Sequence, residues 1–332
     1  MNTTDIAFVC CVESGHLEDP TIRMIESLRR YGGRLAKSQV VAVTPRFSLP
    51  LRRTTRSAFD RLQVDYVRSW QTTNRYSWFK FLNKPLSLVT AQDVVKSKIF
   101  CWIDSDMIVV AEPAKLILNC DEDIVACPAD KEMGSTGPGD RFEEIWQAVL
   151  RVNGLSIDTF PWTTTCQEGA RIRLYWNGGI FAFRGSSGFA REYLDATIRS
   201  LDARIVPKRK DFVVGFNEMS AIGIAAVKLG LRWRELPFSH NYTMGSFLHK
   251  EWYNNERLAA ASIIHYHDAM WPHYWPQFLL QMQSAQPDAA AWLDQSGPMR
   301  NVALAPVRLF NKVLQKRRYD MERRYTAGYG SV

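Results

Sequence analysis

The amino-acid sequence predicts an α/β fold, in which helices flank a mainly parallel sheet and a basic helical tail follows. Short apolar runs rich in β-branched residues alternate with longer amphipathic runs through most of the 332 residues. This alternation is typical of a parallel sheet that carries helices on both faces. Residues 306–325 instead combine helical periodicity with seven Lys or Arg residues against two acidic ones, a net charge of +5. We therefore expect an α/β domain over residues 1–275 and a helical extension over residues 276–332.

Strands are predicted where a short apolar run ends at turn-forming or charged residues. The first of these runs stops at Glu13-Ser14-Gly15. Another leads directly into Asp104-Ser105-Asp106 and is followed at once by a further apolar run. The predicted strands cover residues 6–12, 40–44, 64–67, 99–103, 107–110, 124–127, 180–183 and 262–265.

Helices are predicted where apolar residues recur on one face of a longer segment. The first is expected to begin at Asp19, which can cap it, with Pro20 at the first helical position, and to end at Gly32. Residues 133–140 contain three glycines and a proline, so they form a loop, either a plain surface loop or a mobile active-site flap. The other predicted helices cover residues 84–95, 141–152, 219–229 and 306–325.

Composition limits the class of protein. The chain is 46% hydrophobic and 23% charged, which is ordinary for a globular protein with a sizeable core. A net charge of +8 and a pI near 9.2 favour anionic partners. The six cysteines form no C-x-x-C pair, so we expect them to be reduced. No apolar run reaches the ~18 residues that span a bilayer, and the first residues lack the basic start of a secretory signal, so a cytoplasmic location is expected.

The triplet Asp104-Ser105-Asp106 is the main chemical signal. Ligands of parallel α/β sheets bind at the carboxyl ends of strands, and two carboxylates in a turn can converge there on one hard divalent cation. Such a cation can stabilise the charge of a departing nucleoside diphosphate. A second triplet, residues 121–123, has the same D-x-D spacing but lacks strands on both sides, and is interpreted as a solvated turn.

Two further segments contain polar groups beside predicted strands. His265 ends an apolar run, and a neutral imidazole there is either a metal ligand or a hydrogen-bonded core histidine. Asn177 precedes Gly178 and Gly179 at the entrance to another strand. These glycines permit either close approach of a ligand to the backbone or a simple bulge, and the Asn177 amide can hydrogen-bond sugar hydroxyls.

In this order, the motifs resemble the retaining, family 8 type of GT-A glycosyltransferase. The strand with Asp104 and Asp106 resembles the metal motif of that family. The segment around Asn177 resembles its donor-sugar motif, and His265 its late metal ligand. Asn217-Glu218 stands where the family usually carries Asp-Gln. The similarity covers roughly residues 5–275.

The resemblance implies a GT-A (Rossmann-like) fold and transfer of a hexose-type sugar from a UDP-sugar to a glycan or glycolipid acceptor, with retention at the anomeric carbon. It implies Mn²⁺ or Mg²⁺ held by Asp104, Asp106 and His265. It also implies candidate catalytic residues Asn217 and Glu218. The implied donor-binding residues are Lys84, Asp104, Ser105, Asn177, Gly178, Gly179 and His267.

The chain departs from the family at two positions. Trp271 stands where the family has a diphosphate-binding lysine, so His267, His273 or a basic residue elsewhere is expected to replace that charge. Glu218 replaces the usual glutamine. Because residues alternate along a strand, we also expect only one of His265 and His267 to face the metal, with His265 preferred.

Other functions fit the sequence less well. A sugar-1-phosphate nucleotidyltransferase would share the sheet and the acidic metal site, but it should carry a glycine-rich basic loop after the first strand, and this chain has none there. A basic membrane-binding or nucleic-acid-binding protein without catalysis would explain the charge. No recognised nucleic-acid motif is present, so no nucleic acid is expected. Residues 306–325 either lie on an anionic membrane surface, which predicts a peripheral location on the inner face of the membrane, or pack on the catalytic domain with their basic face in water.

Overall fold

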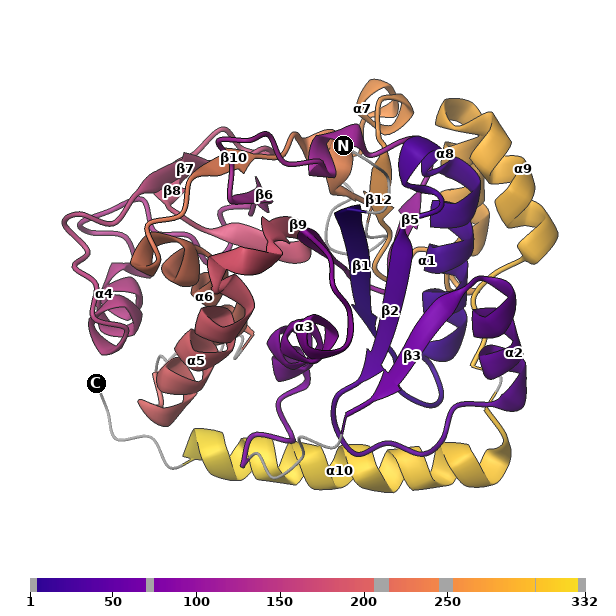
Figure 1. Cartoon of the computed structure of the whole chain (residues 1–332), viewed down its shortest axis with the longest axis horizontal. Helices are drawn as coiled ribbons and strands as arrows, with labels where there is room; N and C mark the ends of the chain where they lie inside the picture. Colours follow the sequence, from indigo (N-terminus) through magenta and orange to yellow (C-terminus); the bar gives the residue numbers. More distant parts are fainter. Residues whose placement is uncertain (1–4, 70–74, 206–214, 245–252, 302, 328–332) are drawn as a thin grey trace.

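The computed structural model describes residues 5–69, 75–205, 215–244, 253–301 and 303–327. It confirms the mixed α/β architecture, with a seven-stranded sheet in the order β10-β6-β9-β4-β1-β2-β3 (Figure 1). All its neighbours are parallel except β9, which runs antiparallel to both β4 and β6. The strands are β1 (Ile6–Cys11), β2 (Gln39–Thr44), β3 (Val64–Arg68), β4 (Ile99–Ile103), β6 (Ile124–Pro128), β9 (Trp176–Arg184) and β10 (Trp233–Glu235).

Alternate residues of the central strands enter two different hydrophobic cores. In β1, Val9 packs in the core that covers one face of the sheet with helices α3, α4, α5 and α6. Its neighbours Phe8 and Cys10 pack in the core on the other face with α1 and α2. The helices of these two layers are α1 (Glu18–Tyr31), α2 (Arg53–Arg61), α3 (Asn83–Val94), α4 (Glu143–Val152), α5 (Phe189–Asp202) and α6 (Phe216–Lys228).

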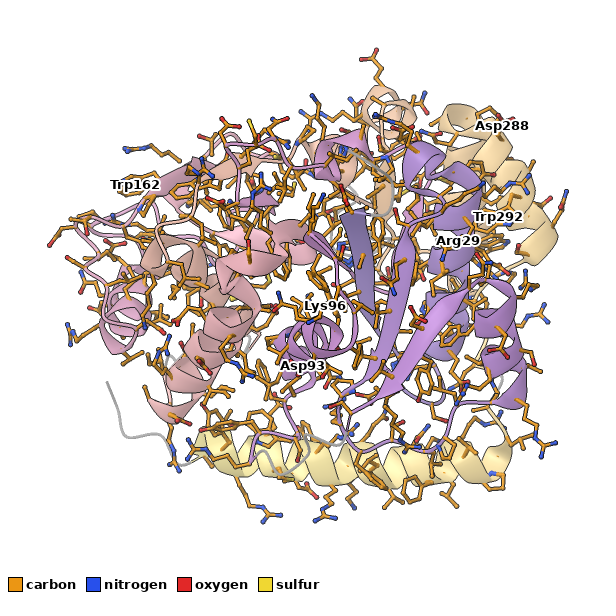
Figure 2. The ribbon with its side chains drawn as sticks, viewed as in Figure 1. Arg29, Asp93, Lys96, Trp162, Asp288 and Trp292 are labelled. Carbon is orange, nitrogen blue, oxygen red and sulfur yellow. The ribbon has the colours of Figure 1, made fainter. Side chains whose placement is uncertain are left out.

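A smaller sheet, β11-β12-β5, extends the fold beside α1. It consists of β5 (Met107–Val109), β11 (Tyr242–Thr243) and β12 (Ile263–His265), with β12 antiparallel to β5. A third core joins it to α8 (Trp275–Ala285) and α9 (Pro287–Ser296). Figure 2 shows Trp292 of α9 beside α1, where its ring packs edge-on against Tyr31 at 5.8 Å. The first part of the predicted extension therefore shares a core with the α/β domain, and the boundary at residue 275 stays a prediction.

The remaining elements are short, apart from the tail helix. Strands β7 (Trp162–Thr164) and β8 (Arg171–Arg173) form a hairpin, and α7 (Asn255–Ala259) precedes β12. Helix α10 (Ala305–Ala327) confirms the predicted tail helix and runs along one edge of the molecule, drawn in yellow at the foot of Figure 1. Within the described parts of the chain, no helix has both the length and the apolar character to cross a membrane.

One prediction about local structure is wrong, one is confirmed, and several elements were not predicted. Helix α1 begins at Glu18, with Leu17 at the capping position, so Asp19 lies inside the first turn and does not cap it. The Glu18 carboxylate instead accepts a hydrogen bond from the Gly15 backbone, 2.9 Å away. All six cysteines are free, as predicted. The unpredicted elements are α2, α5, α7, α8 and α9 and the short strands β7, β8, β10 and β11.

Candidate active site

A cavity of about 750 Å³ lies at the carboxyl ends of β1 and β4. The two strands are parallel neighbours, so the residues that follow them reach the same edge of the sheet. Helix α3 begins at this edge, and one face of α10 forms part of the opposite wall. The charged and polar residues that line the cavity include Glu13, Arg46, Lys84, Asp104, Ser105, Asp106, His267 and Arg318.

Asp106, His265 and His267 form a cluster suited to a metal ion. One ligand atom from each lies within 4.8 Å of the other two. The Nε2 atom of His265 is 3.3 Å from one Asp106 oxygen, and the Nδ1 atom of His267 is 3.9 Å from the other. Burial alone would raise the pKa of Asp106, but the two imidazoles hold it below its usual range. One carboxylate and two imidazoles are ligands that divalent transition metals accept.

The pairing of two short strands positions this cluster. His265 on β12 lies opposite Met107 on β5, and Met107 directly follows Asp106 in the chain. The Tyr266 backbone donates a hydrogen bond to the Asp106 carbonyl over 3.0 Å, which extends the pairing by one step. The Nδ1 atom of His265 is 3.1 Å from the Asn241 side-chain oxygen. That contact orients the ring so that Nε2 faces Asp106, as an outer hydrogen bond does for most metal-binding histidines.

The prediction that only one of the two histidines faces the metal side is wrong. Residues two positions apart share a face of a strand, and the chain also leaves β12 at His265. His267 has a positive φ of 49°, and its ring stacks on that of His265 with centroids 3.9 Å apart. His267, predicted as a donor-binding residue, therefore lies with the candidate metal ligands.

Asp104 lies beside this cluster with other partners. One carboxylate oxygen accepts a hydrogen bond from the Trp102 indole at 2.8 Å, and the other from the Lys84 ammonium at 3.1 Å. Burial raises the pKa of Asp104, and the nearby charge of Lys84 opposes that rise. Among the described residues, the three-ligand cluster contains Asp106 but not Asp104. Metal binding by Asp104 stays a prediction.

The second D-x-D triplet is more structured than a solvated turn. Asp121 is exposed, but Glu122 is buried and binds Arg234 at 2.6 Å. Asp123 pairs with Arg232 at 2.9 Å and Arg184 at 3.5 Å. These ion pairs join the start of β6 to β9 and β10, so they stabilise the sheet.

Lys84 links Asp104 to Glu218. Its ammonium also donates to the Gly178 carbonyl at 2.9 Å and lies 3.9 Å from the Glu218 carboxylate. Glu218, in the first turn of α6, is fully buried and accepts a hydrogen bond from the Tyr193 hydroxyl. Burial raises the pKa of Glu218 to about 7, against the opposing charge of Lys84. Lys84 is therefore a cation between two carboxylates, with only 12% of its side chain exposed.

Asn217 and Glu218 also present polar atoms without partners among the described residues. Both side-chain atoms of Asn217 and one carboxylate oxygen of Glu218 are buried and unpaired there. Unsatisfied buried polar atoms are uncommon and are often found at functional sites. Neither residue lines the described cavity, but Glu218 lies 3.9 Å from the ammonium of Lys84, which does line it.

Gly178 and Gly179 leave room for the site side chains. A Cβ atom at Gly179 would lie 2.6 Å from the Met107 side chain and 3.0 Å from His265. A Cβ atom at Gly178 would lie 3.0 Å from the Lys84 ammonium and 3.2 Å from Glu218. The Gly179 carbonyl also accepts a hydrogen bond from the Asp104 backbone at 2.9 Å. The absence of side chains at Gly178 and Gly179 thus lets strand β9 pack closely against Lys84 and Glu218 and against Met107 and His265.

We expect Gly179→Ala and Gly178→Ala to damage different functions. The Gly179 substitution should displace His265 and weaken Mn²⁺ binding, with about 1–3 kcal/mol of lost stability from overpacking. Gly178→Ala should leave Mn²⁺ affinity unchanged and lower turnover through Lys84. Calorimetric titration of each variant with Mn²⁺ tests this difference. Equal Mn²⁺ affinities for the two variants would contradict it.

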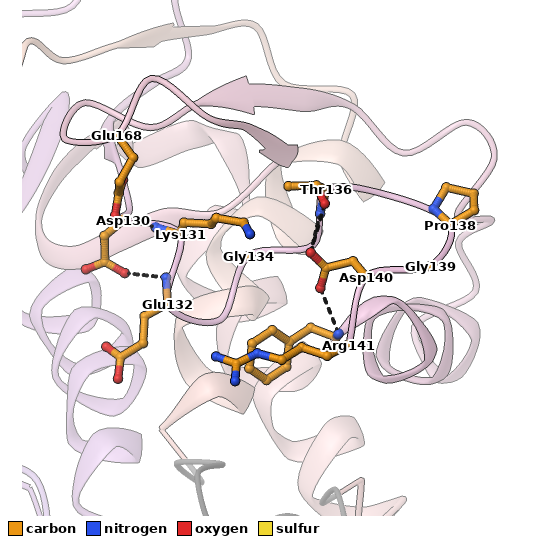
Figure 3. A pocket seen from close by; sticks show the side chains of 11 residues that line it. Asp130, Lys131, Glu132, Gly134, Thr136, Pro138, Gly139, Asp140, Arg141 and Glu168 are labelled. Atoms are coloured by element: carbon orange, nitrogen blue, oxygen red, sulfur yellow. Dashed lines mark hydrogen bonds between the residues drawn. The ribbon is translucent and has the colours of Figure 1, made fainter.

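A second cavity, of about 790 Å³, lies at the predicted loop of residues 133–140 (Figure 3). Its acidic groups hold the loop itself. Asp140 accepts hydrogen bonds from Thr136 and from the Phe142 backbone, and Glu168 from the Lys131 backbone. Ser135 is buried and hydrogen-bonds Glu143. These bonds favour a plain loop over a flap, and the cavity at β4 remains the better candidate for catalysis.

Comparisons with known proteins decide the family. The Rhodobacterales glycosyltransferase domain matches residues 8–212, which include most of β1, the Asp104–Asp106 turn and the two glycines of β9. The chain belongs to this glycosyltransferase family. A comparison with the curated proteins found no match.

Solved structures support the fold of this glycosyltransferase. An active-site mutant of LgtC superposes with a TM-score of 0.50 and 10% identity, covering 84% of this chain and 95% of that one. GlyE of Streptococcus pneumoniae is 13% identical, with a TM-score of 0.48, covering 91% of this chain and 66% of GlyE. The bifunctional glycosyltransferase WbbM is 11% identical, with a TM-score of 0.45, covering 87% of this chain and 51% of WbbM. The superposition on LgtC supports the GT-A fold of the glycosyltransferase. The chain spans 51% of WbbM and 66% of GlyE.

Sequence reasoning missed a second charged cluster in the glycosyltransferase cavity. Glu13, at the end of β1, binds Arg46 at 2.5 Å and Arg318 of α10 at 3.2 Å. Glu13 could have been recognised as a site residue from the sequence, because it directly follows the predicted strand of residues 6–12. That strand, β1, pairs with β4. The contribution of α10 had no local signal, because Arg318 is 305 positions from Glu13.

Proposed function

We propose that this glycosyltransferase transfers a hexose-type sugar from a UDP-sugar to a glycan or glycolipid acceptor, with a divalent metal and with retention. The observation that carries the proposal is the Asp106–His265–His267 cluster at the end of β4, beside a cavity large enough for a nucleotide-sugar. Its ligand chemistry fits Mn²⁺, and fits Mg²⁺ less well because two of the three ligands are imidazoles.

In this proposal Asp106, His265 and His267 hold the metal, with Asp104 adjacent. A bound divalent ion would stabilise the negative charge of the departing diphosphate. Lys84 holds the Asp104 carboxylate in place through a direct hydrogen bond. Asn177 keeps its side-chain oxygen on the Gly179 backbone at 2.8 Å, which leaves its amide group to donate to a sugar hydroxyl. Ser105, between the two acids, lines the same cavity.

Glu218 is the candidate catalytic carboxylate of the proposal. A carboxylate can act as a nucleophile toward a sugar or stabilise positive charge at the anomeric carbon. Its link to Lys84 adds a second role, because loss of the Glu218 charge would leave Lys84 with Asp104 as its only carboxylate partner within 4 Å among the described residues. Tyr193 fixes the orientation of Glu218 from α5.

A screen of UDP-, GDP- and CMP-sugars with and without Mn²⁺ tests the proposed donor. We expect Mn²⁺-dependent consumption of a UDP-sugar and release of UDP, at least slowly with water as acceptor. Consumption of GDP- or CMP-sugars alone would contradict the UDP assignment. Release of pyrophosphate from a nucleoside triphosphate and a sugar-1-phosphate would instead support a nucleotidyltransferase.

We also propose that the outer face of α10 binds an anionic membrane surface, where a glycolipid acceptor would lie. Leu309 and Val313 are exposed there at 65% and 61%, and Lys312, Lys316 and Arg317 are exposed beside them. Exposed aliphatic residues interleaved with basic ones are typical of helices that lie in the headgroup region of a bilayer.

Reversal of the three basic charges on this face tests membrane binding. We expect the Lys312→Glu, Lys316→Glu, Arg317→Glu triple variant to lose co-sedimentation with phosphatidylserine vesicles and to retain activity on a water-soluble acceptor. Each substitution removes about 1 kcal/mol of electrostatic attraction near the surface and also adds repulsion from the new carboxylate.

A matched control reverses three exposed basic residues outside α10. The Lys37→Glu, Lys96→Glu, Arg191→Glu variant has the same change in net charge, and Figure 2 shows Lys96 near the end of α3, away from α10. If both triple variants lose vesicle binding equally, net charge and not the α10 face is responsible, and the proposed membrane surface is wrong.

A further inference from the structure

Helix α10 contributes one face to the donor cavity. Gln315, Arg318, Tyr319 and Glu322 line it, and their spacing along the chain is that of a single helical face. Other residues of α10 anchor the helix: Asn311 donates to the Ser14 carbonyl at 2.9 Å. The helix is therefore part of the cavity wall and not only a surface tail.

Arg318 enters a buried charge cluster at the end of β1. Its guanidinium donates to the Glu13 carboxylate at 3.2 Å and to the Phe47 carbonyl at 2.7 Å. Arg46 binds both oxygens of the same carboxylate, at 2.5 Å and 3.2 Å. The side chains of Glu13 and Arg318 are only 11% and 14% exposed. One carboxylate thus faces two guanidinium groups, and the cluster has an excess of one positive charge.

The start of α3 joins this cluster to the candidate metal site. Asn83 donates to the Glu13 carboxylate at 2.7 Å, and the next residue, Lys84, donates to Asp104 at 3.1 Å. The two clusters therefore border the same cavity, and the adjacent α3 residues Asn83 and Lys84 contact Glu13 and Asp104, respectively. A ligand that spans both clusters would be held by the metal ion at one place and would present an anionic or polar group to Arg46 and Arg318 at another.

We infer that α10 is a built part of the donor site, and that Arg318, with Arg46, binds the anionic part of the nucleoside diphosphate. This inference rests on the proposed function. Arg318 and Arg46 supply positive charge to this cavity. Trp271, which stands where the family has a diphosphate-binding lysine, lines the same cavity but is uncharged. His273, the other candidate near Trp271, is exposed to solvent and does not line the described cavity. A guanidinium suits a phosphate because its N–H groups form paired, charge-assisted hydrogen bonds.

The inference predicts how Arg318 variants bind UDP. In isothermal titration with UDP and Mn²⁺, we expect Arg318→Ala to raise the dissociation constant about tenfold or more, as loss of a charge-assisted hydrogen bond does. Arg318→Lys should bind with intermediate affinity, since it keeps the charge but not the fork. The KM for the donor should rise in parallel, with kcat changed less than KM.

Asn311→Ala is the matched control, because it removes an anchor of α10 that does not line the cavity. We expect it to lower the melting temperature without changing UDP affinity. Circular dichroism establishes that each variant is folded, and Arg318→Lys keeps the test valid should Arg318→Ala unfold.

Two results separate the failure of this inference from that of the proposed function. UDP affinity unchanged in both Arg318 variants, or reduced equally in Asn311→Ala, would overturn the role of Arg318 while leaving the donor assignment intact. If the wild-type protein binds none of UDP, GDP and CMP in the presence of Mn²⁺, the proposed function fails and this inference with it.

Discussion

Asp106→Ala is expected to lower the rate of sugar transfer by roughly a thousandfold or more, the scale expected when the ion that stabilises a leaving diphosphate is lost. The Asp106 carboxylate lies 3.3 Å from the His265 ring nitrogen and 3.9 Å from that of His267. His265→Ala should lower Mn²⁺ affinity strongly with the protein still folded. His267→Ala should lower it as well, because its ring lies on the same side of the cluster. Steady-state rates at saturating Mn²⁺ and direct Mn²⁺ titrations measure the two effects.

The second D-x-D triplet provides the control for this prediction. Asp121→Ala should be neutral for activity and stability, since Asp121 is exposed. Asp123→Ala should keep its catalytic rate but lower the melting temperature, because it breaks two ion pairs with arginines. Loss of transfer in the Asp121 and Asp123 variants, with Asp106→Ala active, would show that the metal site is at the other triplet.

Glu218→Gln is expected to lower kcat severely while donor binding persists, if the carboxylate takes part in the reaction. Its buried carboxyl group has a pKa raised to about 7, so it is mostly neutral below that pH and charged above it. The wild-type kcat should therefore rise as the pH increases through about 7. The Glu218→Gln variant should lack this rise, because its side chain cannot titrate.

The anomeric configuration of the product completes this test. NMR of the first product should show retention. An inverted linkage would contradict the resemblance to the retaining family and would favour a role for Glu218 as a base. Substantial activity of Glu218→Gln would rule out an obligatory covalent intermediate at Glu218.

The parts of the site that could be predicted are those that local sequence determines. An apolar strand that leads into Asp104-Ser105-Asp106 is visible in the sequence, and so is the strand that ends at His265. Both are short runs whose ends are set by the change from buried to polar residues. The glycines of β9 were also visible in the sequence. Their role, which is to leave room for Lys84, Glu218 and His265, depends on tertiary packing and could not be read from it.

The parts that could not be predicted depend on distant contacts or on a single backbone angle. His267 lies beyond the end of β12, and its positive φ contributes to its position beside His265; residue type does not specify such an angle. Lys84 meets Gly178 across 94 positions of sequence, and Arg318 meets Glu13 across 305. The antiparallel direction of β9 within an otherwise parallel sheet also has no local signal, since a buried strand has the same apolar pattern in either direction.

The most direct test of the metal-dependent mechanism is the rate of UDP-sugar consumption before chelation, in excess EDTA, and after Mn²⁺ is restored. We expect the wild-type rate to fall to background in EDTA and to recover with Mn²⁺, while Asp106→Ala stays at background throughout. Full wild-type activity in excess EDTA would contradict the proposal that the Asp106–His265–His267 cluster holds a catalytic metal.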